Sequence, residues 1–236
     1  MLVSAEDIRG LHILATDGEI GKVQDVYFDD ATWNVRFLVV DTGSWLAGKL
    51  VLISAERAGE PNWEKSLLPV ALGKKEIEES PMLDEVKPVS RQHETERYYG
   101  WPASLRAAES PLPLGPFGIP VTAAADVRRE AANRSVRGSG DFHLRSLNEV
   151  VGYHIQATDG EIGHVEDFLV DPATWEIRRM VVATRNWLPG RKVGVQPRWI
   201  QDVRWDERKV HVGLPREEVK ESPEAEMAPV VNTYRT

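Results

Sequence analysis

The sequence predicts an all-β protein of two small β-barrels, each with a short helical turn, joined by a long, partly irregular linker. Three observations support this prediction: an internal repeat, strand-like alternation of apolar and polar residues in each copy, and Asp-containing turns between the strands. Two copies are too few for a solenoid, which needs three or more stacked repeats. Duplication of a complete small domain is therefore the better interpretation, and each copy is expected to bury its own core.

The repeat is long and continuous. Residues 10–21 return as residues 152–163, and the same offset of 142 holds without a gap from Ser4 (Ser146) to Pro81 (Pro223). We place the first copy at residues 1–85, the linker at 86–143, the second copy at 144–223, and an acidic, flexible tail at 224–236. The offset also relates Trp33 to Trp175, Trp45 to Trp187, Trp63 to Trp205, Asp25 to Asp167 and Asp29 to Asp171.

Each copy opens with a helical turn and a hairpin. Ser4-x-x-Asp7 and Ser146-x-x-Glu149 fit the capping-box pattern that begins a helix. Asp17-Gly18 suits the positive φ angles of a tight hairpin turn. Gly21, like Gly163, follows inside the next strand, where a glycine indicates a bulge or a close backbone approach.

The remaining elements read as short strands. Asp29 to Thr32 is expected to form a turn in which side-chain oxygens accept from backbone N–H groups. Residues 33–40 alternate apolar and polar side chains and give the clearest strand, and further strands are expected near 49–53, 63 and 67–72. A helical turn near 74–79 ends the copy. A sheet of five or six such strands usually closes into a barrel, because closure removes exposed edges.

Composition limits the classes of function. The chain has no cysteine, which excludes disulfides, thiol chemistry and Cys-type metal sites. Its net charge of −8 disfavours nucleic acid as a partner, because phosphate binding needs concentrated Lys and Arg. No apolar run approaches the ~20 residues that cross a bilayer, and the start lacks signal-peptide features. We expect a cytoplasmic protein without membrane insertion.

No catalytic, cofactor-binding or metal-ligating residue is predicted. His12 and His154 recur in register beside acidic turns, but neither belongs to a spacing that completes a metal site or an acid–base set. Asp25, Asp29 and their repeats Asp167 and Asp171 are explained by turn capping and strand-edge hydrogen bonds. A His-based metal-dependent sensor remains an alternative, to be tested by metal content and His→Ala substitution.

The candidate contact surfaces are apolar residues in turns and on one sheet face. Trp45-Leu46 and Trp187-Leu188 lie in matching turns, where core packing does not readily explain large apolar side chains. Tyr27 and Phe37 give the first copy a non-polar face, whereas the second copy has Leu169 and Arg179 there, and Lys192 in place of Leu50. Such a face can be hidden by pairing of the two barrels, by homodimerisation, or by another protein.

The ordered set from Gly10 through Asp17-Gly18-Glu19-Ile20-Gly21 to Asp29, followed by residues 33–41, resembles the PRC-barrel domain. The second copy resembles it as well, and Tyr98-Tyr99-Gly100-Trp101-Pro102 is similar to a linker element of bacterial two-barrel proteins. The family includes the photosynthetic reaction-centre H subunit and is related to the C-terminal barrel of a ribosome maturation factor. The resemblance implies protein–protein contact without shared catalytic residues. We therefore expect a non-enzymatic interaction or assembly adaptor, with ribosome- or RNA-linked assembly as the alternative.

Overall fold

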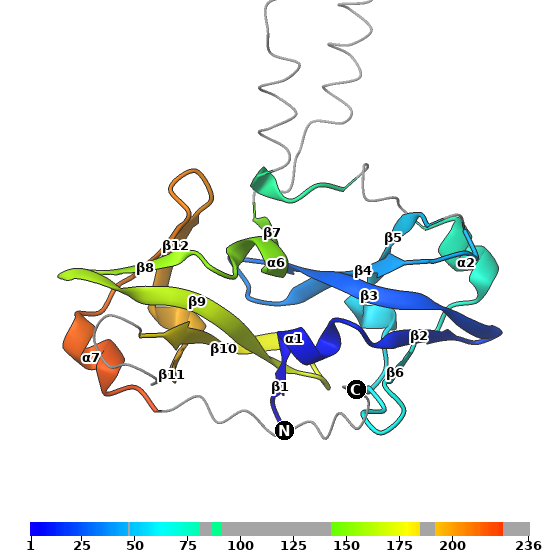
Figure 1. Ribbon diagram of the computed structural model, residues 1–236, viewed down its shortest axis with the longest axis horizontal. Helices are drawn as coiled ribbons and strands as arrows, with labels where there is room; N and C mark the ends of the chain where they lie inside the picture. Colours follow the sequence, from blue (N-terminus) through cyan, green and yellow to red (C-terminus); the bar gives the residue numbers. More distant parts are fainter. Residues whose placement is uncertain (47, 81–85, 91–142, 185–191, 224–236) are drawn as a thin grey trace, which may run out of the picture.

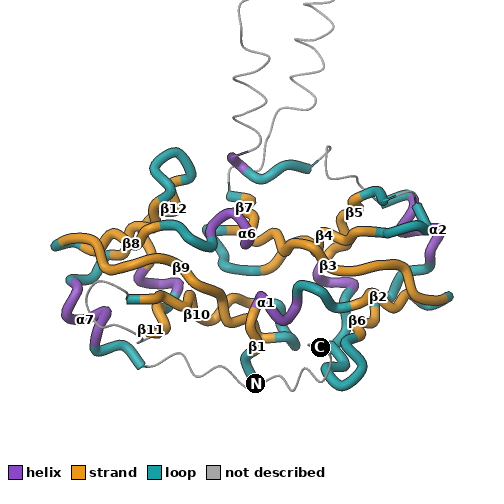
Figure 2. The backbone as a smooth tube through the Cα atoms, in the orientation of Figure 1, coloured by secondary structure: helices purple, strands orange, loops and turns teal. Residues whose placement is uncertain are grey.

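The computed structural model describes residues 1–46, 48–80, 86–90, 143–184 and 192–223. The predicted all-β class is confirmed, because strand residues far outnumber helical ones among the described residues and the helices are single short turns (Figures 1 and 2). None of the described helices is long and apolar enough to cross a membrane.

The first sheet is built mainly from the first copy. Its strands follow the order β5-β4-β3-β2-β6, and the long central strand β3 pairs with β2 and with β4 (Figure 1). The bounds are β1 (Val3–Ser4), α1 (Ala5–Ile8), β2 (His12–Ala15), β3 (Gly18–Asp29), β4 (Val35–Asp41), β5 (Leu50–Ser54), η1 (Ala55–Arg57), β6 (Leu67–Pro69) and α2 (Lys74–Glu78).

The second sheet repeats this arrangement with the second copy. Its strand order is β11-β10-β9-β8-β13-β12, with β9 in the place of β3. The bounds are β7 (Leu144–Ser146), α6 (Leu147–Val150), β8 (His154–Ala157), β9 (Gly160–Asp171), β10 (Glu176–Ala183), β11 (Lys192–Val195), η2 (Pro197–Trp199), β12 (Ile200–Arg204), β13 (Lys209–Val212) and α7 (Arg216–Lys220).

Neither sheet closes into a barrel, so this part of the prediction was wrong. In the described residues the two end strands of each sheet, β5 and β6 or β11 and β12, do not pair to complete a ring, and we call the gap between them the seam. A 3₁₀ turn, η1 or η2, follows β5 or β11 at this seam. In the first copy the isolated bridge between Ala58 and Val70 is the only pairing that the described residues place across this seam. The edge strand β6 is only three residues long and ends at Pro69, which has no N–H to donate. Such a short edge needs no closure to avoid edge-to-edge pairing.

The two copies exchange their first strands. Strand β1 of the first copy pairs with β9 of the second, and β7 of the second copy pairs with β3 of the first. The registers are equivalent, because Val3 pairs with Val170, and the residues at the corresponding positions, Arg145 and Phe28, pair with each other. Figure 1 shows β1 beside the second sheet and β7 beside the first. The intramolecular pairing that the sequence left open against homodimerisation is therefore present.

One hydrophobic core spans both copies, which corrects the expectation that each copy buries its own. Residues from both halves form a single buried cluster, in which Phe28 and Phe168 lie with ring centroids 5.6 Å apart. Both rings are fully buried. The core thus sits between the sheets as well as beneath each of them. The boundaries 1–85 and 144–223 stay a prediction about the repeat units.

The predicted local features appear at both repeats. Gly18 and Gly160 have positive φ angles of 135° and 142° at the hairpin turns. A Cβ on Gly21 or Gly163 would overlap the carbonyl oxygen of Asp41 or Ala183, so the backbones approach closely there. The Asp29 Oδ1 atom accepts from the N–H groups of Ala31 and Thr32, both at 2.9 Å, as expected of this turn.

Candidate interaction site and inter-copy junction

Each exchanged strand, β1 and β7, is joined to the other copy by a serine–aspartate hydrogen bond. Ser4 Oγ donates to Asp167 Oδ2 across the junction, and Ser146 Oγ donates to Asp25 Oδ2 at 2.5 Å. Both serines also cap the helical turn that follows them, as the capping-box pattern predicted. Each serine hydroxyl therefore caps a helical turn of its own copy and donates a hydrogen bond to an aspartate of the other copy.

Asp25 is half-buried and Asp167 is buried, and both carboxylates accept several hydrogen bonds. Asp25 Oδ1 accepts from the N–H groups of Val26 and Asn148, and Asp167 Oδ1 accepts from those of Phe168 and Glu6. Burial nevertheless raises the pKa of each carboxyl above its ordinary value, because desolvation disfavours the charged form. Sequence reasoning assigned these acids to structural hydrogen bonding, but not to bonds between the copies.

The repeated tryptophans Trp33 and Trp175 also join the copies. Both adopt positive φ angles, 59° and 58°, and both side chains are buried. Their carbonyl oxygens accept across the junction, from Ile177 N–H and Val35 N–H respectively, each at 2.8 Å. The left-handed backbone of these non-glycine residues is a sparsely populated conformation. In this conformation each tryptophan carbonyl accepts a hydrogen bond from the other copy, a role that the pattern of tryptophans in the sequence did not indicate.

A second apolar cluster lies outside the shared core, on the first copy. Tyr27, Val39, Leu52 and Leu144 are buried in it, and Phe37, Leu50 and Val86 are half-buried against them. We call these seven residues the outer cluster. Tyr27 is only 1% exposed, whereas Phe37 keeps an accessible edge. Of the two predicted contact residues on this face, Phe37 is the one whose side chain a partner can reach.

The turn after β4 carries the other predicted contact residues of the first copy. Trp45 and Leu46 are half-buried, and Trp45 packs against the shared core. The turn is closed by bonds from Gly48 N–H to Gly43 O and from Thr42 Oγ1 to Lys49 O. Trp187 and Leu188 lie outside the described residues, and so do Tyr98 to Pro102.

The two repeated histidines each contact one carboxylate. His12 Nδ1 lies 3.1 Å from Glu19 Oε1, and His154 Nδ1 lies 2.7 Å from Glu161 Oε1. All four side chains are substantially exposed on neighbouring strands. Among the described residues no group of three or more potential metal ligands is present.

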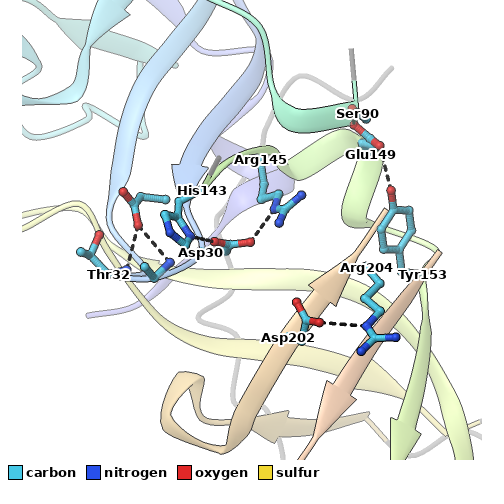
Figure 3. A network of polar contacts seen from close by, with 11 residues as sticks. Asp30, Thr32, Ser90, His143, Arg145, Glu149, Tyr153, Asp202 and Arg204 are labelled. Atoms are coloured by element: carbon cyan, nitrogen blue, oxygen red, sulfur yellow. Dashed lines mark hydrogen bonds and ion pairs between the residues drawn. The ribbon is translucent and has the colours of Figure 1, made fainter. Parts of the chain in front are cut away.

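The start of the predicted linker is anchored to the second copy. Pro88, Val89 and Ser90 are buried, and Ser90 Oγ donates to Glu149 Oε2. Tyr153 OH donates to the other oxygen of Glu149 at 2.8 Å, as Figure 3 shows. Burial and this carboxylate raise the pKa of the Tyr153 phenol. The rest of the linker, residues 91–142, lies outside the described part of the chain.

A cluster of charged residues lies beside this network, where the copies meet. His143 and Arg145 both point toward Asp30, with distances of 2.8 Å from His143 Nδ1 to Oδ1 and 2.5 Å from Arg145 Nε to Oδ2 (Figure 3). Asp202 accepts separately from Arg204 Nε at 2.9 Å. Sequence reasoning missed this cluster, because His143 is the last residue of the predicted linker and Arg145 lies just after it.

Comparison with known proteins places the first copy in a family. A search of curated proteins found no match to the chain. Residues 2–78 match the family model of the PRC-barrel domain, which covers the elements from β1 to α2. The N-terminal copy of the repeat is therefore a PRC-barrel domain.

Proposed function

We propose that this protein is a non-catalytic assembly adaptor, which binds a protein partner through the outer cluster of its first copy. The PRC-barrel match supports an interaction role at the level of the family. The observation that carries the proposal for this chain is the outer cluster itself, an apolar cluster separate from the core that joins the copies, with three half-buried members at its edge. Half-buried apolar residues around a packed centre are typical of protein contact sites.

The difference between the copies supports the location. Strand β4 presents Phe37 and strand β5 presents Leu50, but the repeat has Arg179 and Lys192 at these positions. Lys192 forms an ion pair with Glu166, so that face of the second copy is charged. Two copies with one scaffold and different outer faces fit an adaptor in which only one face makes an apolar contact.

The exchanged strands support a rigid scaffold for this surface. Leu144, which is fully buried in the outer cluster, comes from β7 of the second copy. The apolar face of the first copy is therefore completed by the second copy, and a partner that binds there recognises the paired state. This gives the duplication a role in binding as well as in stability.

The test exchanges the differing residues. A Phe37→Arg/Leu50→Lys variant gives the first copy the residues of the second, and Leu14→Lys is the control, because Leu14 is 38% exposed on the distant strand β2. Affinity capture at low and high salt should recover the same protein with wild type and the control, but not with the double variant. Apolar contact should survive high salt, whereas RNA-containing complexes should dissociate. Equal capture by the double variant would refute the location.

A further inference from the structure

A cleft of about 450 Å³ opens between the two copies on one side of the junction. Its walls come from the turn after β3, from the segment leading into β7, and from η2 with β12. The volume lies in the range of small-molecule sites in proteins, roughly 300–1,000 Å³. The residues that matter for its chemistry are Asp30, His143, Arg145, Pro197, Arg198 and Ile200.

The charged lining of this cleft is not needed for the strand exchange. Arg145 occupies the position that Val3 occupies in the other exchanged strand, and Val3 is 3% exposed and pairs in the equivalent register. His143 corresponds to Met1, and Asp30 corresponds to Pro172. The same backbone junction therefore forms with wholly apolar side chains. The charged set on one side requires another explanation.

Two arginines in the cleft have unused hydrogen-bond donors. Arg145 Nε donates to Asp30, but Nη1 is buried without an acceptor, and Nη2 has none in the described part of the chain. A buried donor without a partner is energetically unfavourable, so an acceptor there would be favoured. Arg198 is exposed and lies with its guanidinium carbon 5.5 Å from the Trp199 ring centroid. It forms no ion pair with any residue that the structure describes.

The acidic residues of the cleft limit the charge of the missing acceptor. Asp30 is already paired with His143 and Arg145, and Asp202 with Arg204. A dianion such as phosphate would lie near both carboxylates and be repelled, whereas a single carboxylate would balance the two arginines with less repulsion. Pro197 and Ile200 provide partly accessible apolar surface for the body of such a ligand.

We propose that this inter-copy cleft binds a small organic carboxylate, whose oxygens accept hydrogen bonds from Arg145 and Arg198. The apolar part of the ligand lies against Pro197 and Ile200, at the junction of the copies. The site is distinct from the outer cluster and does not depend on the proposed adaptor role.

The probe for the test is benzoate, with its neutral analogue benzamide and inorganic phosphate for comparison, measured by titration calorimetry on the full chain. One benzoate per chain should bind, and more tightly than benzamide or phosphate. Arg145→Val copies the residue of the equivalent strand, and Arg198→Ala removes an exposed side chain that cannot affect folding strongly. Loss of a hydrogen bond to a charged group should weaken benzoate binding about tenfold to a hundredfold in each variant.

Arg57→Ala is the control, since Arg57 is an exposed arginine on η1 of the first copy, outside the cleft lining. It should leave benzoate affinity unchanged, which separates a local contact from a general loss of positive charge. The proposal is overturned by absence of saturable benzoate binding, by equal binding of benzamide, by tighter binding of phosphate, or by unchanged affinity in Arg198→Ala.

Discussion

Replacing Ser146 with alanine should destabilise the whole chain, because this hydroxyl has two roles at the junction. Its oxygen accepts from Glu149 N–H as a helix cap, and its proton is donated to Asp25 Oδ2 at 2.5 Å. Loss of a serine cap costs about 0.5–2 kcal/mol, and loss of a hydrogen bond to a charged group about 1.5–3 kcal/mol. We therefore expect the free energy of unfolding to fall by about 2–5 kcal/mol.

The assay is urea denaturation followed by circular dichroism, with linear extrapolation of the free energy of unfolding. Because one core spans both copies, wild type and Ser146→Ala should each unfold in a single transition. Ser80→Ala is the control, since Ser80 Oγ donates to the Glu76 carbonyl oxygen at an exposed helix end. It should change the free energy by less than about 0.5 kcal/mol. Two separated transitions, or equal stability of Ser146→Ala and the control, would refute the reasoning.

We expect three further outcomes, two at the junction and one at a close backbone approach within the first copy. Phe168→Ala should lower the free energy of unfolding by about 3–5 kcal/mol, as measured by urea titration, because it leaves a cavity against Phe28. Gly21→Ala should lower the melting temperature far more than Gly43→Ala, because only its Cβ would overlap the backbone of Asp41. Asp25 has a raised pKa in the folded chain, so the native state binds its proton more tightly than the unfolded state does. Wild type should therefore gain stability relative to Asp25→Asn as the pH falls through that raised pKa, and a difference independent of pH would contradict this.

The repeat made much of the local structure predictable. Strands β3 and β9 begin at Gly18 and Gly160 and have equal length, and the serine caps and Asp29 turn form as their residue types require. These features depend on neighbours in the sequence, which both copies share. Barrel closure was overpredicted, because the argument from exposed edges did not anticipate that the 3₁₀ turns would leave a seam between short end strands.

The strand exchange could not be predicted, because both copies carry the same serine and aspartate at the exchange. Ser4 can contact an aspartate at position 25 or at position 167, and the sequence around the two aspartates offers the same partners. The choice depends on the paired arrangement of the sheets, which periodicity does not encode. The repeat in the sequence therefore predicts the strands within each copy, but it does not predict which copy each first strand pairs with.

The candidate sites were predictable only where the copies differ. Phe37 against Arg179 and Leu50 against Lys192 were visible in the aligned repeat, and they mark the accessible part of the outer cluster. Val86 and Leu144, which complete that cluster, adjoin the linker and have no pattern of their own. Arg145 against Val3 was also a visible mismatch, but its position next to the predicted linker concealed its meaning.

These mismatches indicate how a duplicated domain can acquire binding sites without loss of the pairing between its copies. At the junction, Val3 and Arg145 occupy equivalent positions in two strands that both pair correctly. The serine–aspartate bonds and the strand registers are equivalent on both sides, so they maintain the pairing whichever side chain is present. One side can therefore carry an arginine with unused donors while the other keeps the apolar packing. A homodimer of one copy would place the same residue on both sides, and only the fused pair allows the two sides to differ.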